Sequence, residues 1–540
     1  MHQADMIIFG NAIFDGISEE PYQGFVVING NRIAEVNRGF PKRDAFGMDT
    51  LWIDAGDRLV SAGFIDSHVH MLMAGLFEKY ANLLDARSEE ETVQIVQKRT
   101  EELGETEGWI YGFSWYHYFW EKKDLPTKKS LDSVFPDRPV FLLNWEAHGC
   151  WVNSKALELC GITKDTPDPD GGRIERDENG EPTGILHESA MGLVTIQAME
   201  FSKEREKDIL RIFSRYANSY GVTAITDVQP FFHGNMGHVD VYNEMTESGE
   251  LTVRVTVAPD LLGDLDEVLE LDRKYRSEKI HVDMVKQFVD GVPSAYTGLL
   301  LEDYADDPGN KGRILYDLDA IGKKIGEAHR RGLSVKLHSC GDGSFRKAFE
   351  WYRDAIKTYG MNECRHCIEH CELAAPEDVA QLGKYHIIPS IQPDAIATTE
   401  TFDDDPYRVR LGEERAAKTW PFRDLLTSAG VVSYGTDCPV MGMNPFPQIC
   451  RAVTRLHDDG LPEGGWNPTQ KLTVREGLIG YTYGSAYSMH REGDLGTLET
   501  GKLADVVIMS KNILAMPPEE VKDVTVDYTI MDGKIVYQKY

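Results

Sequence analysis

GFIDSHVH, residues 63–70, is the stretch that decides the fold, because an apolar run ends there in two histidines one residue apart. The run is typical of a buried strand, and residues i and i+2 of a strand point to the same face. His68 and His70 are therefore expected to converge. Two imidazoles do not complete a metal site, so the rest of the chain must supply further ligands.

Seven more apolar runs follow, and the segments between them, such as AIGKKIGEAHRRG at residues 320–332, have helical periodicity. The runs are GVTAITDV (221–228), LTVRVTVAP (251–259), VDMVKQFVDG (282–291), LSVKLHSC (333–340), CRHCIEHC (364–371), HIIPSIQP (386–393) and VVSYGTDCPV (431–440). Eight β/α units predict an α/β fold of the (β/α)8 type, a TIM barrel.

The two ends of the chain are alike in pattern. Short strand-like runs surround an Asn-Gly pair at residues 29–30 and an Asp-Gly pair at residues 532–533, and both pairs favour hairpin turns. We predict that residues 1–60 and 490–540 form a small β-sandwich domain and that residues 61–489 form the barrel. The interval after the first barrel strand is too long for one helix, which predicts an inserted subdomain at about residues 76–205.

Composition argues against several classes of protein. With 41% hydrophobic and 27% charged residues the chain is typical of globular proteins, and no window approaches the roughly eighteen apolar residues of a membrane span. A formal net charge of −31 should repel nucleic acid and anionic membrane surfaces. The first residues do not have the pattern of a secretory signal, and eight cysteines in 540 residues fit reduced thiols, so a cytoplasmic location is expected.

Side chains that can bind metal recur on the predicted strands. They are His68 and His70 at the end of the first strand, Lys286 in the fourth, His338 at the end of the fifth, His370 of the sixth and Asp437 of the eighth. The carboxyl ends of barrel strands meet at one face. Each residue alone would more often be structural, but independent accidents would not all fall at that face. Imidazole and carboxylate groups suit zinc, iron or manganese.

These segments also carry a family resemblance. The motifs are the HxH strand, VKQFVDG (285–291), HSCGD (338–342), IEH (368–370), GTDCPV (435–440) and GTLETGKLADVVI (496–508). In combination they resemble the amidohydrolase superfamily, and in particular its long-insert branch, amidohydrolase family 3, which includes N-substituted formamide deformylases. GWIYGFSW (108–115) and GEPTGILHE (180–188) resemble the insert of that branch.

The resemblance implies a barrel, a flanking β-sandwich and two divalent metal ions, with zinc favoured over iron or manganese. It implies that one ion is bound by His68, His70 and Asp437, the other by His338 and His370, and that Lys286, carboxylated by carbon dioxide, bridges them. A metal-activated hydroxide would cleave a C–N bond of a small-molecule amide, with Asp437 as the catalytic residue that moves the proton. Barrels of this branch often pair, so a homodimer is one alternative for the subunit number.

Two positions depart from the pattern of the branch. Cys367 stands where arginine is expected, and Gln287 stands where an apolar residue is commoner. Neither departure removes a ligand. Cys364 and Cys367 form a C-x-x-C motif, but a structural zinc ribbon needs a second such pair, and the sequence contains none.

Other functions stay open at this point. A deaminase of a cyclic amidine uses the same barrel, commonly with one metal ion and no bridging lysine, so the placement of Lys286 favours the amide hydrolase. A non-catalytic regulatory or binding relative is the other alternative, because a fold can outlive its chemistry.

The insert supplies three candidates for the substrate pocket: Trp115, His148 and His187. Their structural alternative is packing, since aromatic clusters such as GWIYGFSWYHYFWE (108–121) more often form a core than a pocket. If they do line a pocket, an apolar or aromatic group on the substrate is expected.

Overall fold

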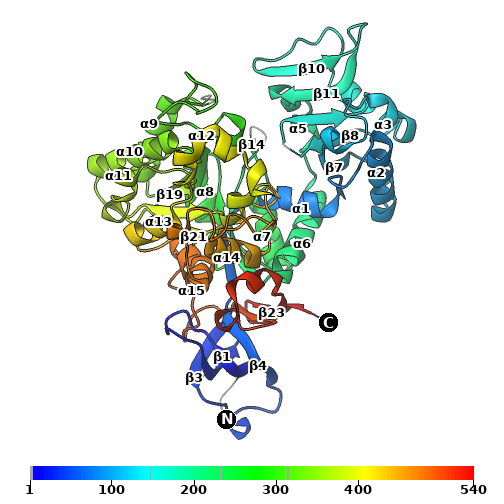
Figure 1. Cartoon of the computed structure of the whole chain (residues 1–540). Helices are drawn as coiled ribbons and strands as arrows, with labels where there is room; N and C mark the ends of the chain where they lie inside the picture. Colours follow the sequence, from blue (N-terminus) through cyan, green and yellow to red (C-terminus); the bar gives the residue numbers. More distant parts are fainter. Residues whose placement is uncertain (1–3, 146, 232–233, 313–315, 400, 540) are drawn as a thin grey trace. The chain divides into compact units, whose positions relative to one another are not determined.

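The computed structural model describes residues 4–145, 147–231, 234–312, 316–399 and 401–539. The chain forms two compact units (Figure 1). Unit 1 contains Met1–Met71, Ser214–Pro230 and His238–Tyr540, and unit 2 contains Leu72–Phe213 and Phe231–Gly237. The six predicted metal ligands belong to unit 1, whereas the three predicted pocket residues belong to unit 2.

Strands from both ends of the chain share one sheet of unit 1. They are β1 (Met6–Ile13), β2 (Tyr22–Asn29), β3 (Arg32–Arg38), β4 (Leu51–Ala62), β22 (Val506–Met509), β23 (Val526–Met531) and β24 (Lys534–Gln538), in the order β24-β23-β22-β4-β1-β2-β3. Antiparallel pairing of β4 with β22 joins the two ends of the chain, with Ala62 opposite Val506. Both hairpins form: β23 and β24 are joined by the predicted Asp-Gly turn, whereas the turn between β2 and β3 lies at residues 30–31, one residue later than predicted. Figure 1 shows these segments in blue and red.

Within the described residues of unit 1, eight parallel strands fall inside the eight predicted apolar runs. They are β5 (Phe64–Val69), β12 (Val222–Val228), β15 (Arg254–Ala258), β17 (Met284–Phe288), β18 (Ser334–Ser339), β19 (Cys367–His370), β20 (Ile388–Ile391) and β21 (Ser433–Tyr434). Together with the short β16 (Ile280–His281) they form two sheets, β16-β15-β12-β5 and β17-β18-β19-β20-β21. Single parallel bridges join Val69 to Cys438 and Asp260 to Lys286.

Helices alternate with these strands along the chain. They are α6 (Lys203–Ser219), α7 (Val239–Glu247), α8 (Leu265–Tyr275), α9 (Leu318–Arg330), α10 (Asp342–Tyr359), α11 (Pro376–Val379), α12 (Pro406–Ala416), α13 (Phe422–Ala429), α14 (Pro445–Thr454), α15 (Val474–Ile479) and α16 (Ser485–Ser488). In α9 the apolar positions Ile321 and Ile325 are buried, and Asp317 caps the first turn by accepting from two backbone amides.

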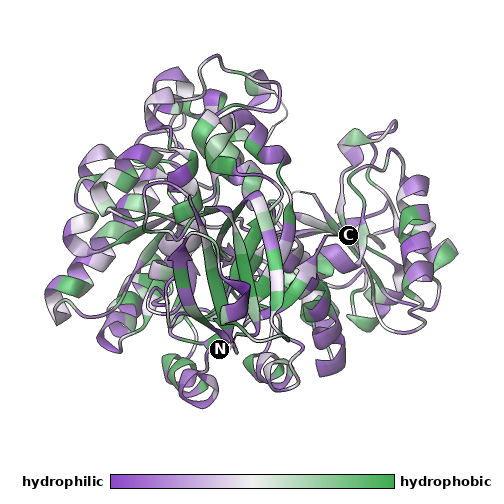
Figure 2. Cartoon of the chain, turned by 90° about the horizontal axis from the view of Figure 1, so that it is seen from below, coloured by the Kyte–Doolittle hydropathy of each residue, from purple (hydrophilic) through white to green (hydrophobic). Residues whose placement is uncertain are grey.

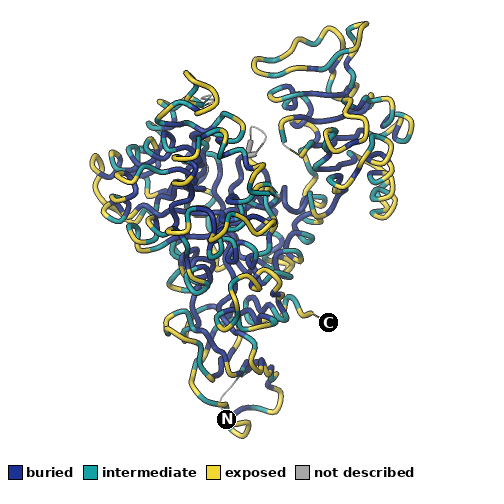
Figure 3. Tube along the Cα trace, in the orientation of Figure 1, coloured by how far each residue is buried: buried dark blue, intermediate teal, exposed yellow. Residues whose placement is uncertain are grey.

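The strands are apolar because they are buried on both faces, as parallel strands between helices are. Every residue of β5, β12 and β15 is buried. Figure 2 shows hydrophobic residues in green along the central strands of unit 1, and Figure 3 shows those strands as buried and the outer helical turns as exposed. Polar side chains inside this layer therefore need a specific partner or a function.

Unit 2 is built around a separate six-stranded sheet. Its strands are β6 (Ala81–Asn82), β7 (Ile110–Trp115), β8 (Val140–Asn144), β9 (Gly149–Val152), β10 (Gly172–Arg176) and β11 (Pro182–Glu188), in the order β10-β11-β9-β8-β7-β6. Its helices are α2 (Glu89–Leu103), α3 (Lys128–Val134), α4 (Ser154–Leu159) and α5 (Gly192–Ala198). The segment α1 (Met71–Lys79) connects β5 to this unit, and the pair β13 (Pro230–Phe231) and β14 (Gly234–Asn235) forms a small two-stranded sheet. Among the helices that the structure describes, none combines the length and apolar character that a membrane crossing requires.

A buried ion pair fastens β15 to the C-terminal part of the chain. The guanidinium of Arg254 donates from Nε and Nη2 to the two carboxylate oxygens of Asp505, at 2.8 and 2.9 Å, and from Nη2 to Asp532 at 3.0 Å. Burial alone would lower the pKa of Arg254, but the Asp505 carboxylate raises it well above its usual value. The guanidinium is therefore charged and depends on these carboxylates.

We expect Asp505→Ala to lower the free energy of unfolding by about 3–5 kcal/mol, because it leaves a buried guanidinium without its main partner. Urea unfolding of the variant and the wild type measures the difference. Glu414→Ala, which breaks an exposed pair with Lys418, is the control and should change little. Equal stability of Asp505→Ala and wild type would show that the pair does not hold this part of unit 1 together.

Candidate metal centre

The six predicted ligands lie at or near the carboxyl ends of the parallel strands. His68 is in β5 and His70 follows it, Lys286 is in β17, His338 is in β18, His370 ends β19 and Asp437 follows β21. Two backbone hydrogen bonds tie the end of β5 to the loop after β21: Asp437 N donates to His68 O at 2.8 Å, and His70 N donates to Cys438 O at 2.9 Å. Predicted ligands far apart in sequence are thereby held at one place.

His68 is the centre of the cluster. Its Nε2 lies 3.3 Å from Asp437 Oδ1 and 3.3 Å from Lys286 Nζ. The same carboxylate oxygen lies 3.4 Å from His70 Nε2. Three strands thus bring four of the predicted residues into contact.

The other two histidines adjoin this group. The ring centroid of His370 lies 5.1 Å from that of His68 and 4.2 Å from that of His338. Burial lowers the pKa of all three rings well below its ordinary value, so the imidazoles are neutral and keep a lone pair for a metal. Potential ligand atoms of His68, His370 and Asp437 lie within 4.8 Å of one another, as do those of His338, Cys340 and His370.

The donor set fits a divalent cation. His370 Nε2 is buried and has no hydrogen-bond partner among the described residues. Leaving such a buried polar atom unsatisfied costs about 1–3 kcal/mol. A cation bound by His370 would satisfy this nitrogen, and the nearby Asp437 carboxylate would help to balance the positive charge. Imidazole and carboxylate ligands are those that zinc, iron and manganese accept.

The backbone is unusual at two of these ligands. His370 and Asp437 have φ values of 72° and 60°, in the left-handed region that residues other than glycine rarely adopt. Such conformations cost of order 1–3 kcal/mol and persist where the surrounding structure enforces them, commonly at functional sites. These two φ values set the directions of the His370 side chain, at the end of β19, and of the Asp437 side chain, just after β21.

Two buried lysines face each other in the register of β17 and β18, where Lys286 is opposite Lys336. Lys336 Nζ donates to Glu369 Oε1 at 2.8 Å and to Ser67 O at 3.0 Å. Burial alone would lower the pKa of Lys336, but Glu369 raises it. Lys286 has no such carboxylate partner among the described residues, and burial lowers its pKa to about 8. The two lysines therefore differ in their partners and in their electrostatic environment.

Three further side chains of this cluster are not evident from the sequence motifs: Glu369, Lys336 and Cys340. Glu369 Oε2 lies 2.6 Å from His68 Nδ1, and Cys340 Sγ lies 3.4 Å from His338 Nε2. Strand alternation was the available signal for one of them, since Lys336 stands two residues before His338 and shares its face. For Glu369 the alternation misleads, because it is adjacent to His370, whose left-handed backbone breaks the strand geometry.

The predicted pocket residues lie in unit 2 and differ in environment. Trp115 is only 2% exposed, packs near Trp120 and Trp151, and donates from Nε1 to Leu142 O at 2.9 Å. It is thus part of the hydrophobic core of unit 2.

The two histidines of that set lie in a more open part of unit 2. His148 is exposed, and its Nδ1 lies 3.0 Å from Glu188 Oε2. His187 is partly exposed, with its Nε2 3.7 Å from Glu175 Oε2. Contact of His148 or His187 with a substrate remains a prediction.

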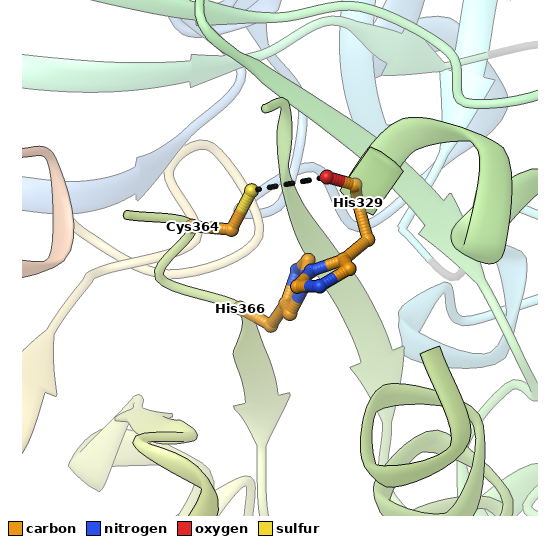
Figure 4. Close-up of side chains that lie close together, drawn as sticks. All are labelled: His329, Cys364 and His366. Carbon is orange, nitrogen blue, oxygen red and sulfur yellow. Dashed lines mark hydrogen bonds between the residues drawn. The ribbon is translucent and has the colours of Figure 1, made fainter. Parts of the chain in front are cut away.

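A second histidine cluster lies at the amino ends of β18 and β19 (Figure 4). His329 Nδ1 lies 2.9 Å from His366 Nε2, His329 Nε2 lies 2.9 Å from Gly360 O, and Val335 N donates to His366 Nδ1 at 3.1 Å. Cys364 Sγ contacts the carbonyl oxygens of Leu333 and His329. Every ring nitrogen has a partner, so this cluster is a satisfied hydrogen-bond network. No group of three or more potential ligands among the described residues includes Cys367, which gives a zinc ribbon no support.

The chain is similar to known proteins over nearly its whole length. A sequence profile described as amidohydrolase family matches residues 52–537. The protein LONG AFTER FAR-RED 3 of Arabidopsis thaliana is 31% identical, with 99% of this chain and 92% of the relative aligned. The N-substituted formamide deformylase of Arthrobacter pascens is 24% identical, with 95% of each chain aligned.

A solved structure is similar over the same extent. It is an uncharacterized metal-dependent hydrolase from Pyrococcus furiosus, with 26% identity, a TM-score of 0.77, and coverage of 94% of this chain and 99% of that one. The chain belongs to the amidohydrolase family. Its fold is accordingly of the TIM-type α/β class, and the family and this relative support metal-dependent hydrolase activity.

Proposed function

We propose that this chain is a metal-dependent hydrolase that cleaves an amide-type C–N bond in a small molecule. The observation that carries the proposal is the convergence of six residues from five strands, among them the unsatisfied His370 Nε2. The deformylase relative, aligned over nearly the whole chain, favours N-acyl or N-formyl compounds as the substrate class.

In this proposal His68, His70 and Asp437 hold one divalent ion and His338 and His370 hold the other, with zinc first and iron or manganese as alternatives. Bound metal would lower the pKa of a water molecule to near neutrality and polarise the carbonyl of the substrate. The buried, neutral imidazoles provide ligands without adding charge, so the negative charge would come from Asp437 and from the carbamate proposed for Lys286.

Asp437 would handle the protons. Burial alone would raise the pKa of Asp437, but the adjacent His68 and His70 lower it below its usual value. The ionised carboxylate can accept a proton from the attacking water and return it to the nitrogen that leaves. Its φ of 60° and its backbone bond to His68 O hold the carboxylate in place for both transfers.

Lys286 would act as a carbamate. The Nζ–carbon bond forms with carbon dioxide, the amine loses a proton, and the product is an anionic oxygen ligand. Burial lowers the pKa of Lys286, which favours the neutral amine that this reaction needs. The 3.3 Å contact with His68 Nε2 places Lys286 Nζ beside the other proposed ligands. An ammonium at that place would instead repel the cations.

We also propose that the eight parallel strands close into a barrel through the bridges Val69–Cys438 and Asp260–Lys286. The strands β5, β17, β18, β19 and β21 would then carry the ligands around one mouth. The seven-stranded sheet built from both termini would be the β-sandwich domain, and unit 2 the inserted subdomain.

An activity assay distinguishes the candidate functions. Purified protein is incubated with divalent metal and a panel of N-formyl amines, N-acyl amines, cyclic amides and cyclic amidines. We expect turnover of an amide, its loss with a chelator and its return with zinc. Ammonia release from a cyclic amidine alone would identify a deaminase. Metal-free protein without turnover would contradict the proposal and support a non-catalytic role.

A further inference from the structure

The interior of the strand layer beneath the metal centre contains a buried ion pair with no role in the chemistry above. Lys336 and Glu369 are both fully buried, and their Nζ and Oε1 atoms lie 2.8 Å apart. The remaining carboxylate oxygen, Oε2, lies 2.6 Å from Nδ1 of His68. A buried ion pair contributes little net stability compared with apolar packing, so its presence here calls for another explanation.

The hydrogen bond to Glu369 determines which nitrogen of His68 carries the proton. Glu369 Oε1 accepts from the Lys336 ammonium at 2.8 Å, so the side chain is the carboxylate of a buried ion pair, and its Oε2 can only accept. His68 Nδ1 must therefore be protonated. A ring that carries its single proton on Nδ1 has its lone pair on Nε2, which lies 3.3 Å from both Asp437 Oδ1 and Lys286 Nζ.

We propose that Lys336 and Glu369 form a tautomer lock for His68: Lys336 fixes the orientation of the carboxylate, and the carboxylate keeps the His68 Nε2 lone pair free for metal. Lys336 also donates to Ser67 O, so one ammonium positions the carboxylate and the backbone next to His68. The inference rests on the proposed function, because it requires His68 to be a ligand. Outer groups of this kind change metal affinity by about 10–100-fold.

The lock makes an unusual prediction for Glu369→Gln. Lys336 has only donors, so it would hold the glutamine carbonyl and turn the amide NH2 towards His68 Nδ1. That NH2 donates, which moves the ring proton to Nε2 and blocks the ligand atom. We expect metal affinity to fall by about 10–100-fold.

Adding Lys336→Met to Glu369→Gln should restore binding. Without the ammonium, the glutamine can rotate so that its carbonyl accepts from His68 Nδ1, which returns the lone pair to Nε2. We expect the double variant to regain most of the lost affinity. If the ion pair only stabilised the fold, the second substitution would destabilise the protein further, and the double variant would bind metal more weakly than Glu369→Gln.

Competition with a chromophoric chelator measures zinc affinity in these variants, and cobalt absorption reports the ligand geometry independently of activity. Asp505→Asn, which alters the other buried ion pair described above, is the matched control and should keep wild-type affinity. Thermal unfolding of the metal-free proteins separates loss of fold from loss of binding.

Two results would overturn the tautomer lock. One is a zinc affinity of Glu369→Gln equal to that of the wild type, and the other is a double variant that binds zinc no more tightly than Glu369→Gln. If Glu369→Gln does not fold, Lys336→Met/Glu369→Gln is compared with Lys336→Met/Glu369→Met, neither of which buries a charge at this pair. The glutamine variant should bind zinc about 10-fold more tightly or better, and equal affinities would overturn the lock. The proposed function itself would be contradicted if the wild-type protein bound no metal, or if His68→Ala bound zinc as tightly as the wild type.

Discussion

Asp437→Asn is expected to lower turnover by about 10²–10⁴-fold, the usual contribution of a positioned general acid–base group. The asparagine keeps the size of the side chain, and its amide oxygen can still approach a cation. It cannot take a proton from water and return it to the leaving nitrogen. Steady-state kinetics on the best substrate of the amide panel measures the effect.

Asp354→Asn, on the exposed face of α10, is the matched control for this substitution and should leave turnover unchanged. Metal content of both variants must be measured alongside the rates, because Asp437 is also a proposed ligand. Turnover by metal-loaded Asp437→Asn within a few fold of wild type would contradict the proton-transfer role and would leave only metal binding for this carboxylate.

Lys286→Met should cause the second large loss. Methionine has similar length but cannot form a carbamate, so the bridging anion disappears and metal content should fall. Loss of one Lewis-acid centre removes several kcal/mol of transition-state stabilisation, which corresponds to a decrease in turnover of about 10²–10³-fold. Elemental analysis of the purified variant and kinetics with added zinc measure the two effects.

Lys324→Met on the surface of α9 is the control and should behave as wild type. Native mass spectrometry supplies an independent test, because carboxylation adds the mass of carbon dioxide to the wild type and not to Lys286→Met. Full metal content and turnover in Lys286→Met would show that Lys286 bridges nothing.

The sequence could predict the strands and which polar side chains gather at their carboxyl ends for one physical reason. Parallel strands between helices are almost wholly apolar, so polar residues such as His68, His338 and Asp437 stand out at their ends. The directional rule that carboxyl ends of parallel strands meet then relates residues hundreds of positions apart. The structure places His370 beside His68, and His338 beside His370, as that rule requires.

The interior network could not be predicted in the same way. The contact from Glu369 to His68 depends on which side chains of non-adjacent strands meet inside the layer, and the sequence pattern carries no such information. The left-handed φ of His370 also lets two consecutive residues, Glu369 and His370, approach His68. Strict alternation would place only one of them there.

Unit 2 shows a different limit of sequence reasoning. Tryptophan occurs both in cores and in pockets, so the residue type does not decide the place of Trp115. Its burial against Trp120 and Trp151 depends on how β7 and β9 pack within that unit. Composition alone predicts an aromatic cluster but does not separate its buried members from exposed ones such as Tyr118.

The most direct test of the central claim is a crystal structure of the protein grown with zinc, with anomalous data collected on both sides of the metal absorption edge. The account predicts anomalous density among His68, His70 and Asp437, and a second peak beside His338 and His370. Absence of density at these residues, or density only at His329, Cys364 and His366, would contradict it.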